Sequence, residues 1–279
     1  MSKERNCATC KNFSIEKVVK NNTSKTPSWL KKHNFVEEFI NATPVKLIKP
    51  KTFNLKVSIK VDIAHKNKYV LYWAALPSNS LIIKSAKSAY GDFSNYGVVK
   101  VNELGNINMV LKCPQPYKTV PYKKQLEETF YRHVHFCFSD KYHRFWEHKL
   151  YTKVVVCHLT LKETLYLHAN DNIILLNVLP CEYYAKSHIP NSFNLPYNKI
   201  KNLSEKDLIK WIKELVNLNY HKLNHLVNKK KINIYELPIV VYCAHDKCVA
   251  SEIAALELLK KGFVNVMEYK GGMKEYLKL

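Results

Sequence analysis

The stretch from residue 239 to residue 251 constrains the fold of this chain more than any other part of the sequence. It begins with the apolar, largely β-branched run Ile239–Tyr242, continues through a polar loop at 243–248, and enters a helical pattern of apolar residues after Ala250. A short apolar run of this kind is typical of a strand covered on both faces in a parallel sheet. The sequence therefore predicts a strand, a loop and a helix, with Cys243 at the end of the strand.

The position of Cys243 is compatible with two roles. A cysteine at the end of a strand, with a helix N-terminus aimed at its loop, lies in a positive field that lowers the pKa of a thiol and attracts anions. A buried cysteine that only fills space in a core has the same local pattern. The candidate nucleophile is therefore Cys243, and the candidate anion-binding loop consists of Ala244, His245, Asp246, Lys247 and Cys248.

Hydrophobic periodicity predicts two domains behind an irregular lead-in. Between residues 53 and 157, apolar residues alternate with polar ones, most clearly at Leu55, Val57, Ile59, Val61 and Ile63. Alternation is typical of half-buried strands. After residue 159, short apolar runs alternate with helical patterns, as in a parallel α/β sheet. We expect a tail and lead-in over residues 1–50, an antiparallel β-sandwich over 51–158, and an α/β parallel-sheet domain over 159–279.

The same patterns predict individual strands and helices. Further strands are expected over residues 69–76, 97–101, 107–111, 130–138 and 150–157, with a glycine-containing turn between the 97–101 and 107–111 strands. Thr160 and Glu163 have the spacing of a capping box, and Ser204 precedes an amphipathic run, so both positions predict helix starts. A weaker amphipathic pattern predicts a helix over residues 28–40.

The composition indicates which cellular compartment and which binding partners to expect for this protein. No apolar run approaches the roughly 18–20 residues of a membrane span, and Met1–Asn6 is not followed by the apolar core of a signal peptide. We therefore expect a cytoplasmic, intracellular protein. The formal net charge of +21 predicts salt-dependent, nonspecific binding to nucleic acid or other polyanions. Abundant Lys, Asn, Ile and Tyr also fit an A/T-rich genome, such as that of a virus or parasite, and a viral origin would allow association with the virion.

Eight cysteines are spread along the chain without the spacing of a disulfide scaffold, so free thiols are expected. Cys7 and Cys10 form a lone C-x-x-C pair. With no second pair nearby, an unstructured tail is favoured over a metal or redox site.

One resemblance concerns residues 97–157. His133 and His135 lie two positions apart on a predicted strand, so they point to the same face and can share one metal ion. With Tyr117 upstream, this order resembles the core of the intradiol ring-cleavage dioxygenases. The resemblance implies a non-haem iron held by His133, His135 and two tyrosines, of which the second matches Tyr117. No tyrosine follows the strand of Trp73 at the expected spacing, and Tyr90 and Tyr96 are loose candidates. The alternative is a dioxygenase-like or transthyretin-like sandwich without metal.

A more extensive resemblance covers residues 160–279. Three blocks occur in order: 174–178 followed by Glu182 and Tyr183, then 188–196, then 239–263 followed by 269–273. Together they resemble the rhodanese family. The resemblance implies that Cys243 accepts a sulfane sulfur and passes it on as a persulfide, with no cofactor. The implied partner is a small sulfur-containing anion such as thiosulfate, or a protein persulfide donor. The length of the 243–248 loop is similar to that of the sulfurtransferases of the family rather than its phosphatases.

This sequence departs from the family pattern near the expected site. Asn177 and Leu179 stand where the family has an acidic and a basic residue, and the loop lacks its usual glycine and terminal arginine. Cys248 occupies the arginine position. It can resolve an oxidised Cys243 as a disulfide or act as a small filler at the helix start. Lys247 can attract an anionic donor, while His245 either holds a proton or is simply solvated.

Three functions therefore remain open at this point. The first is a rhodanese-like sulfurtransferase that acts through Cys243. The second is a non-catalytic interaction module with a basic, polyanion-binding surface. The third is a metal-binding, dioxygenase-like sandwich. Whether the rhodanese-like site turns over is left open by the missing loop arginine.

Overall fold

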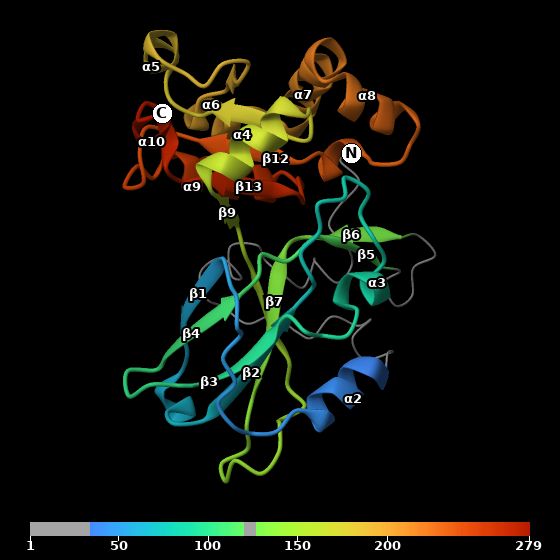
Figure 1. Ribbon diagram of the computed structural model, residues 1–279, viewed down its shortest axis with the longest axis vertical. Coiled ribbons are helices and arrows are strands. Elements are labelled where there is room, and N and C mark those ends of the chain that lie inside the picture. The colour runs from blue at the N-terminus through green and yellow to red at the C-terminus, as the bar shows by residue number, and fades with distance from the viewer. Residues whose placement is uncertain (1–33, 120–126) are drawn as a thin grey trace. The chain divides into compact units, whose positions relative to one another are not determined.

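The computed structural model describes residues 34–119 and 127–279, and these residues divide into two compact units (Figure 1). The N-terminal unit extends to Val155, and the C-terminal unit comprises residues 156–279 together with Ser80–Ile82. In the described part of the chain, no helix combines the length and the apolar character that crossing a membrane requires.

The N-terminal unit is built from antiparallel strands. A four-stranded sheet has the order β3 (Tyr96–Lys100), β2 (Tyr69–Ala74), β7 (His133–Phe138) and β8 (Tyr151–Val154). Two antiparallel pairs accompany it: β1 (Leu55–Lys60) with β4 (Asn106–Leu111), and β5 (Tyr117–Thr119) with β6 (Glu128–Phe130). The described helical segments of this unit are α2 (Asn34–Ala42), η3 (Ile63–His65) and α3 (Ala86–Tyr90). Antiparallel sheets are thus confirmed, whereas their arrangement as a sandwich stays a prediction.

Burial explains why some of these strands alternate in sequence and others do not. In β1, Leu55, Val57 and Ile59 are buried and the three residues between and after them are exposed, as the alternating pattern predicts. Strand β2 is paired on both sides, by β3 and β7, and every residue from Val70 onward is buried. A strand with both faces covered carries a continuous apolar run.

Two features of the strand pairing differ from what the sequence alone indicates. The predicted turn forms, with the Gly105 amide donating to the Asn102 carbonyl at 3.0 Å. Gly105 has a φ of +76°, which favours glycine. The strands on either side of the turn do not pair with each other, because β3 joins β2 whereas β4 joins β1.

The predicted strand over residues 150–157 is also two separate strands. Tyr151–Val154 is β8 of the antiparallel sheet, while β9 (Cys157–Leu159) pairs in parallel with β13 (Val266–Tyr269). The apolar run through residues 154–157 suits either sheet, so its periodicity cannot locate the break.

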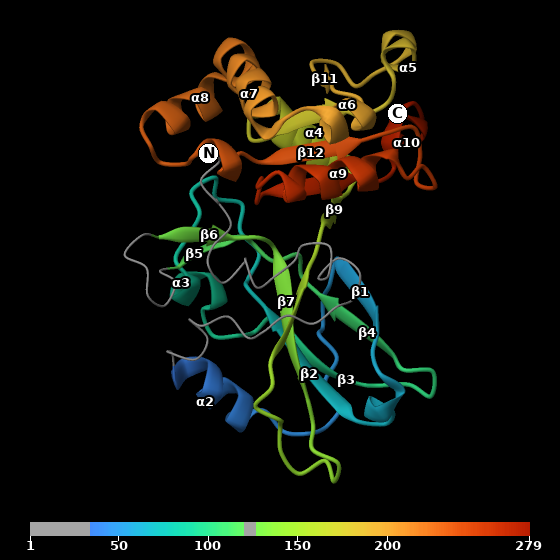
Figure 2. The same ribbon diagram turned by 180° about the vertical axis from the view of Figure 1, so that it is seen from behind.

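The C-terminal unit contains a five-stranded sheet whose neighbouring strands are all parallel, which confirms the predicted α/β sheet. Its order is β11 (Phe193–Asn194), β10 (Ile174–Asn177), β12 (Ile239–Tyr242), β13 and β9. Helices lie on both faces, with α4 (Leu161–Ala169) in front of the sheet in Figure 1 and α9 (Ala250–Lys260) in front of it in Figure 2. The other helical segments are α5 (Cys181–Lys186), α6 (Tyr197–Asn202), α7 (Glu205–Asn219), α8 (His221–Asn228), η4 (Ile234–Glu236) and α10 (Gly272–Tyr276).

The predicted helix starts are confirmed in this unit. Thr160 caps α4, its Oγ1 accepting from the Glu163 amide at 3.2 Å while Glu163 Oε2 accepts from the Thr160 amide at 2.8 Å. Ser204 caps α7 by accepting from the Asp207 amide at 3.1 Å. Such bonds satisfy amides that a helix start otherwise leaves unpaired.

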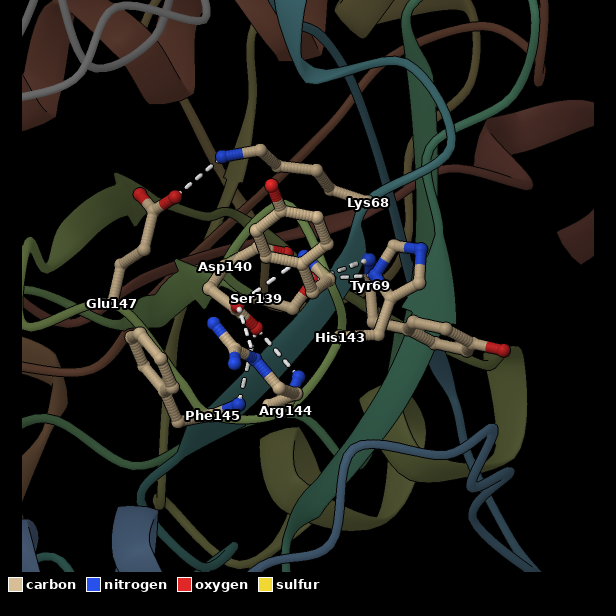
Figure 3. A network of polar contacts seen from close by, with 9 residues as sticks. Lys68, Tyr69, Ser139, Asp140, His143, Arg144, Phe145 and Glu147 are labelled. Carbon is tan, nitrogen blue, oxygen red and sulfur yellow. Dashed lines mark hydrogen bonds and ion pairs between the residues drawn. The ribbon is translucent and has the colours of Figure 1, made fainter.

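A polar network closes the turn that follows β7 (Figure 3). The Asp140 carboxylate accepts from the amides of Tyr142 at 3.2 Å, Arg144 at 2.5 Å and Phe145 at 3.1 Å. Ser139 Oγ accepts from the Tyr69 amide at 3.1 Å, so the turn is tied to the start of β2. A carboxylate that satisfies several amides of one turn holds the backbone in a single conformation.

We predict that Asp140→Ala lowers the urea midpoint of unfolding more than Asp140→Asn, because the asparagine oxygen still accepts from part of the turn. Asp92→Ala is the matched control, since the Asp92 carboxylate accepts from the Ser94 amide within an exposed turn. An effect of Asp140→Ala no larger than that of Asp92→Ala would contradict the structural role of the network.

Candidate functional site

Cys243 lies directly after β12, the central strand of the parallel sheet. Strand β12 pairs with β10 on one side and β13 on the other, and each of its residues is fully buried. The Cys243 residue itself has 0% exposure. Helix α9 begins at Ala250, after the 243–248 loop. The strand, loop and helix predicted for this stretch are therefore confirmed, and ligands of open α/β sheets bind at this carboxyl edge.

The 243–248 loop is held by backbone contacts of its own. The Cys248 amide donates to the His245 carbonyl at 2.9 Å, and the Lys247 amide donates to His245 Nδ1 at 3.3 Å. Asp246 and Lys247 are exposed, whereas Ala244, His245 and Cys248 are partly buried. The loop thus presents one cationic and one anionic side chain to solvent beside the buried thiol.

The C-terminal residues also fix this loop. The amides of Met273 and Lys274 donate to the carbonyls of Cys243 at 3.0 Å and Ala244 at 2.8 Å. Between them and β13 stands Gly272, whose φ is +60°. A Cβ atom at Gly272 would lie only 2.5 Å from the Cys243 carbonyl oxygen. Glycine is required here because both the conformation and the close approach of two backbones exclude a side chain.

The environment of the Cys243 thiol favours its protonated form. Sγ lies 3.1 Å from Ser251 Oγ, 3.5 Å from the Cys248 carbonyl oxygen and 3.8 Å from the His245 carbonyl oxygen. Burial raises the pKa of Cys243, the Ser251 hydrogen bond partly opposes this effect, and the neighbouring Cys248 thiol adds to it. Burial and two carbonyl acceptors therefore outweigh the field expected from the α9 N-terminus. The resting residue is a neutral thiol.

A second cluster lies in the N-terminal unit and joins residues from three elements. His133 and His135 come from β7, Tyr117 from the start of β5 and Tyr90 from the end of α3. The two Nε2 atoms are 3.0 Å apart, and His133 Nε2 lies 3.0 Å from the Tyr117 hydroxyl and 3.4 Å from the Tyr90 hydroxyl. The two hydroxyls are 3.3 Å apart. Four polar atoms of fully or almost fully buried side chains therefore face one another.

Hydrogen bonds at the opposite ring nitrogens orient both histidines. His133 Nδ1 lies 2.5 Å from the Tyr131 carbonyl oxygen, which can only accept, so Nδ1 carries the proton and Nε2 carries a lone pair. His135 Nδ1 lies 2.7 Å from Thr152 Oγ1. Burial lowers the pKa of His133 to about 4, although the bond to Tyr131 opposes the shift, and burial and His133 together lower the pKa of His135. Both imidazoles are neutral at neutral pH and can serve as ligands.

The sequence alone did not identify the complete cluster. His133, His135 and Tyr117 were candidates and Tyr90 was a loose one, and the structure brings all four together. Tyr96 lies instead on β3, edge-on to Phe39 at 5.3 Å between ring centroids. Tyr90 was difficult to single out because it ends a short helix rather than following the strand of Trp73. Among the described residues, no group of three or more His, Cys, Asp and Glu side chains is placed to hold a metal ion, so any metal here would depend on the tyrosines.

The cysteines do not all match the expected free thiols. Cys137, Cys181, Cys243 and Cys248 are free. Cys113 and Cys157 are disulfide-bonded, so the expectation is wrong for these two. Cys7 and Cys10 lie outside the described residues.

We predict that Gly272→Ala destabilises the C-terminal unit by about 2 kcal/mol or more, because alanine is strained at positive φ and its Cβ would overlap the Cys243 carbonyl. Gly271→Ala is the matched control. Gly271 has a helical φ of −61°, and a methyl group added there would meet atoms of the flexible Glu275 side chain, which can move away. Urea denaturation measures both variants, and equal midpoints would contradict the close approach at Gly272.

Comparisons with known proteins indicate which family the C-terminal unit resembles. Residues 160–279 match the family model of the rhodanese-like domain, while the intradiol dioxygenase resemblance of the N-terminal unit stays a prediction. A search of curated proteins found no match. Two similar solved structures are the human single domain sulfurtransferase TSTD1 and the Saccharomyces cerevisiae single domain sulfurtransferase RDL2. The first is 19% identical, covering 43% of this chain and 95% of that chain with a TM-score of 0.31. The second is 21% identical, covering 44% and 90% with a TM-score of 0.31. The match to the rhodanese-like domain therefore covers residues 160–279, less than half of the chain.

Proposed function

We propose that the C-terminal unit is a sulfurtransferase that carries a sulfane sulfur as a persulfide on Cys243. The observation that carries the proposal is the position of Cys243 at the carboxyl end of the central parallel strand, within a domain that matches the rhodanese-like family model. A rhodanese-like domain needs no cofactor for this chemistry, because the cysteine sulfur is itself the carrier.

The proposed reaction has two displacement steps. Cys243, once deprotonated, attacks the sulfane sulfur of a donor such as thiosulfate. The sulfur–sulfur bond of the donor breaks, sulfite leaves with the bonding electron pair, and Cys243 becomes a persulfide. A nucleophilic acceptor then attacks the outer sulfur and releases the Cys243 thiolate. The exposed Lys247 is the loop residue suited to attracting an anionic donor, which is a small sulfur-containing anion or a protein persulfide.

Cys248 is proposed as a resolving thiol for the same site. The Cys248 carbonyl oxygen lies 3.5 Å from Cys243 Sγ, so the backbone of one cysteine borders the thiol of the other. A Cys248 thiolate that attacks the inner sulfur of the Cys243 persulfide would expel hydrosulfide and leave a disulfide. The alternative role as a filler at the start of α9 involves no such exchange.

We predict that the purified protein forms thiocyanate from thiosulfate and cyanide, and that Cys243→Ser abolishes this activity because the sulfur carrier is removed. Cys181→Ser is the matched control, since Cys181 is a free cysteine that is exposed on α5. Colorimetric thiocyanate measurement gives the rate. A folded wild-type protein that is inactive with every sulfane donor, or a Cys243→Ser variant as active as wild type, would contradict the proposal.

A second function is favoured by the cluster of Tyr90, Tyr117, His133 and His135. Donor atoms bound about 2.1 Å from one metal ion lie roughly 3.0–3.4 Å from each other, and the four measured separations run from 3.0 Å to 3.4 Å. Two neutral imidazoles and two phenol oxygens suit iron, whose positive charge would have to offset the burial that raises the pKa of Tyr90. We propose that these side chains hold a non-haem iron in a dioxygenase-like unit. Iron bound there would supply Lewis-acid and one-electron chemistry.

We predict that protein purified in the presence of iron retains the metal and absorbs visible light through phenolate-to-iron charge transfer. Tyr90→Phe should weaken this absorption and lower the iron content, because one of the four donors is lost. Tyr166→Phe is the matched control, since Tyr166 is 66% exposed on α4. Elemental analysis that finds neither iron nor copper in colourless, folded protein would contradict this second function.

The remaining alternative is a non-catalytic module with a basic, polyanion-binding surface. This alternative rests only on the net charge of +21. The expectations about a viral origin and about the virion rest only on amino-acid usage. We therefore do not propose it as the function.

A further inference from the structure

A chain of hydrogen bonds connects the buried Cys243 thiol to the surface of the C-terminal unit. Cys243 Sγ lies 3.1 Å from Ser251 Oγ, and Ser251 Oγ donates to Glu268 Oε1 at 2.6 Å. Glu268 Oε2 pairs with His158 Nε2 at 3.1 Å. The Glu268 side chain is only 3% exposed, whereas that of His158 is 46% exposed. The chain thus begins at a fully buried sulfur and ends at an imidazole in contact with water.

Regular elements hold each member of this chain in place. Ser251 lies in the first turn of α9, Glu268 on β13 and His158 on the edge strand β9. Glu268 and His158 are direct partners in the parallel pairing of β13 with β9, so their side chains lie on the same face of the sheet. This placement is independent of the exposed part of the 243–248 loop.

The direction of the hydrogen bonds follows from the number of protons available. A serine hydroxyl has one proton, and Ser251 donates it to the Glu268 carboxylate. With that proton committed to Glu268, Ser251 Oγ can only accept from the Cys243 thiol, whose single proton also has the carbonyl oxygens of Cys248 and His245 within reach. Burial opposes ionisation of Glu268, but hydrogen bonds from His158 and Ser251 and the positive charges of His158 and Lys270 outweigh it, so the pKa of Glu268 is lowered. The resting chain runs from a thiol donor to an ionised carboxylate.

We propose that Ser251 and Glu268 form a proton relay that activates Cys243, with His158 as the residue that positions Glu268. This inference rests on the proposed role of Cys243 as a nucleophile. As Sγ attacks, its proton moves to Ser251 Oγ and the Ser251 proton moves to Glu268 Oε1, while Glu268 Oε2 keeps its pairing with His158 Nε2. The products are a sulfur bonded to the electrophile and a neutral Glu268 carboxylic acid, so charge and protons balance. The proton returns along the same chain when the Cys243 thiolate is released.

A proton relay would remove the proton that the surroundings of Cys243 keep on its thiol. Burial and the facing carbonyls keep Cys243 protonated, and a protonated thiol is a poor nucleophile. The other titratable groups that influence the chain are Cys248 beside Cys243 and Lys270 beside Glu268. A purely electrostatic role for Glu268 would have the opposite effect, because a nearby carboxylate disfavours the thiolate.

A proton relay and a purely electrostatic role predict opposite changes in the reactivity of Cys243 when Glu268 is neutralised, so the two can be tested directly. Labelling of Cys243 by iodoacetamide in folded protein at neutral pH is followed by peptide mass spectrometry, and the exposed Cys181 serves as the internal reference. The relay predicts that Glu268→Gln slows Cys243 labelling about tenfold or more, because glutamine cannot accept a proton, while Cys181 is unaffected. A rate in Glu268→Gln that is unchanged or faster would overturn the relay, as would a wild-type Cys243 that does not react.

Further variants keep the test decisive if Glu268→Gln does not fold. His158→Ala removes the half-exposed side chain that pairs with Glu268 Oε2 and should slow Cys243 labelling, whereas His158→Gln keeps a donor and should slow it less. Ser251→Ala should also slow Cys243 labelling. The Ser251→Ala/Glu268→Gln double variant should label Cys243 no more slowly than the slower single variant, since the effects of residues that act as one unit do not add. Additive effects, or normal labelling of Ser251→Ala, would overturn the relay.

This test is separate from that of sulfur transfer because labelling needs no sulfane donor. If thiocyanate forms but Glu268→Gln labels normally, only the relay is wrong. If Glu268→Gln slows labelling but no donor yields thiocyanate, the relay stands and Cys243 serves a different electrophile.

Discussion

The pairing of β12 with a parallel strand on each side is the constraint on which the C-terminal unit depends. Every residue of β12 is fully buried, so its amides and carbonyls are satisfied by the ladders to β10 and β13. The chain must leave this layer at Cys243, and the amides of Met273 and Lys274 fix where it does so. The position of the thiol is therefore set by the sheet and by the backbone at Gly272, and much less by the exposed loop residues.

Both candidate sites consist of buried polar side chains that satisfy one another. Burial of such groups costs free energy unless each finds a partner. In the N-terminal unit, two tyrosine hydroxyls and two imidazole nitrogens meet within 3.4 Å, and second hydrogen bonds orient the rings. In the C-terminal unit, a serine and a glutamate link the thiol to His158. In the proposed relay, this buried chain supplies the proton acceptor for Cys243.

Local patterns predicted much of this fold, and non-local partners account for the rest. The alternation in β1, the caps at Thr160 and Ser204, and the strand before Cys243 were predictable because each depends on neighbouring residues. The separation of β3 from β4 was not, because each strand finds its partner elsewhere in the chain. For the same reason, Tyr90 was only one of two loose candidates and Glu268 was missed. Tyr90 meets His133 across 43 positions, and Glu268 reads locally as one polar residue in an apolar strand.

The central claim is that Cys243 carries sulfur, and the most direct measurement is localisation of the added sulfur atom. Protein incubated with thiosulfate, freed of excess donor and alkylated would be digested and analysed by tandem mass spectrometry. We predict an alkylated persulfide on the peptide that contains Cys243, with the exposed Cys181 carrying only the alkyl group. An unmodified Cys243 in folded protein, or sulfur distributed equally over the free cysteines, would contradict the account.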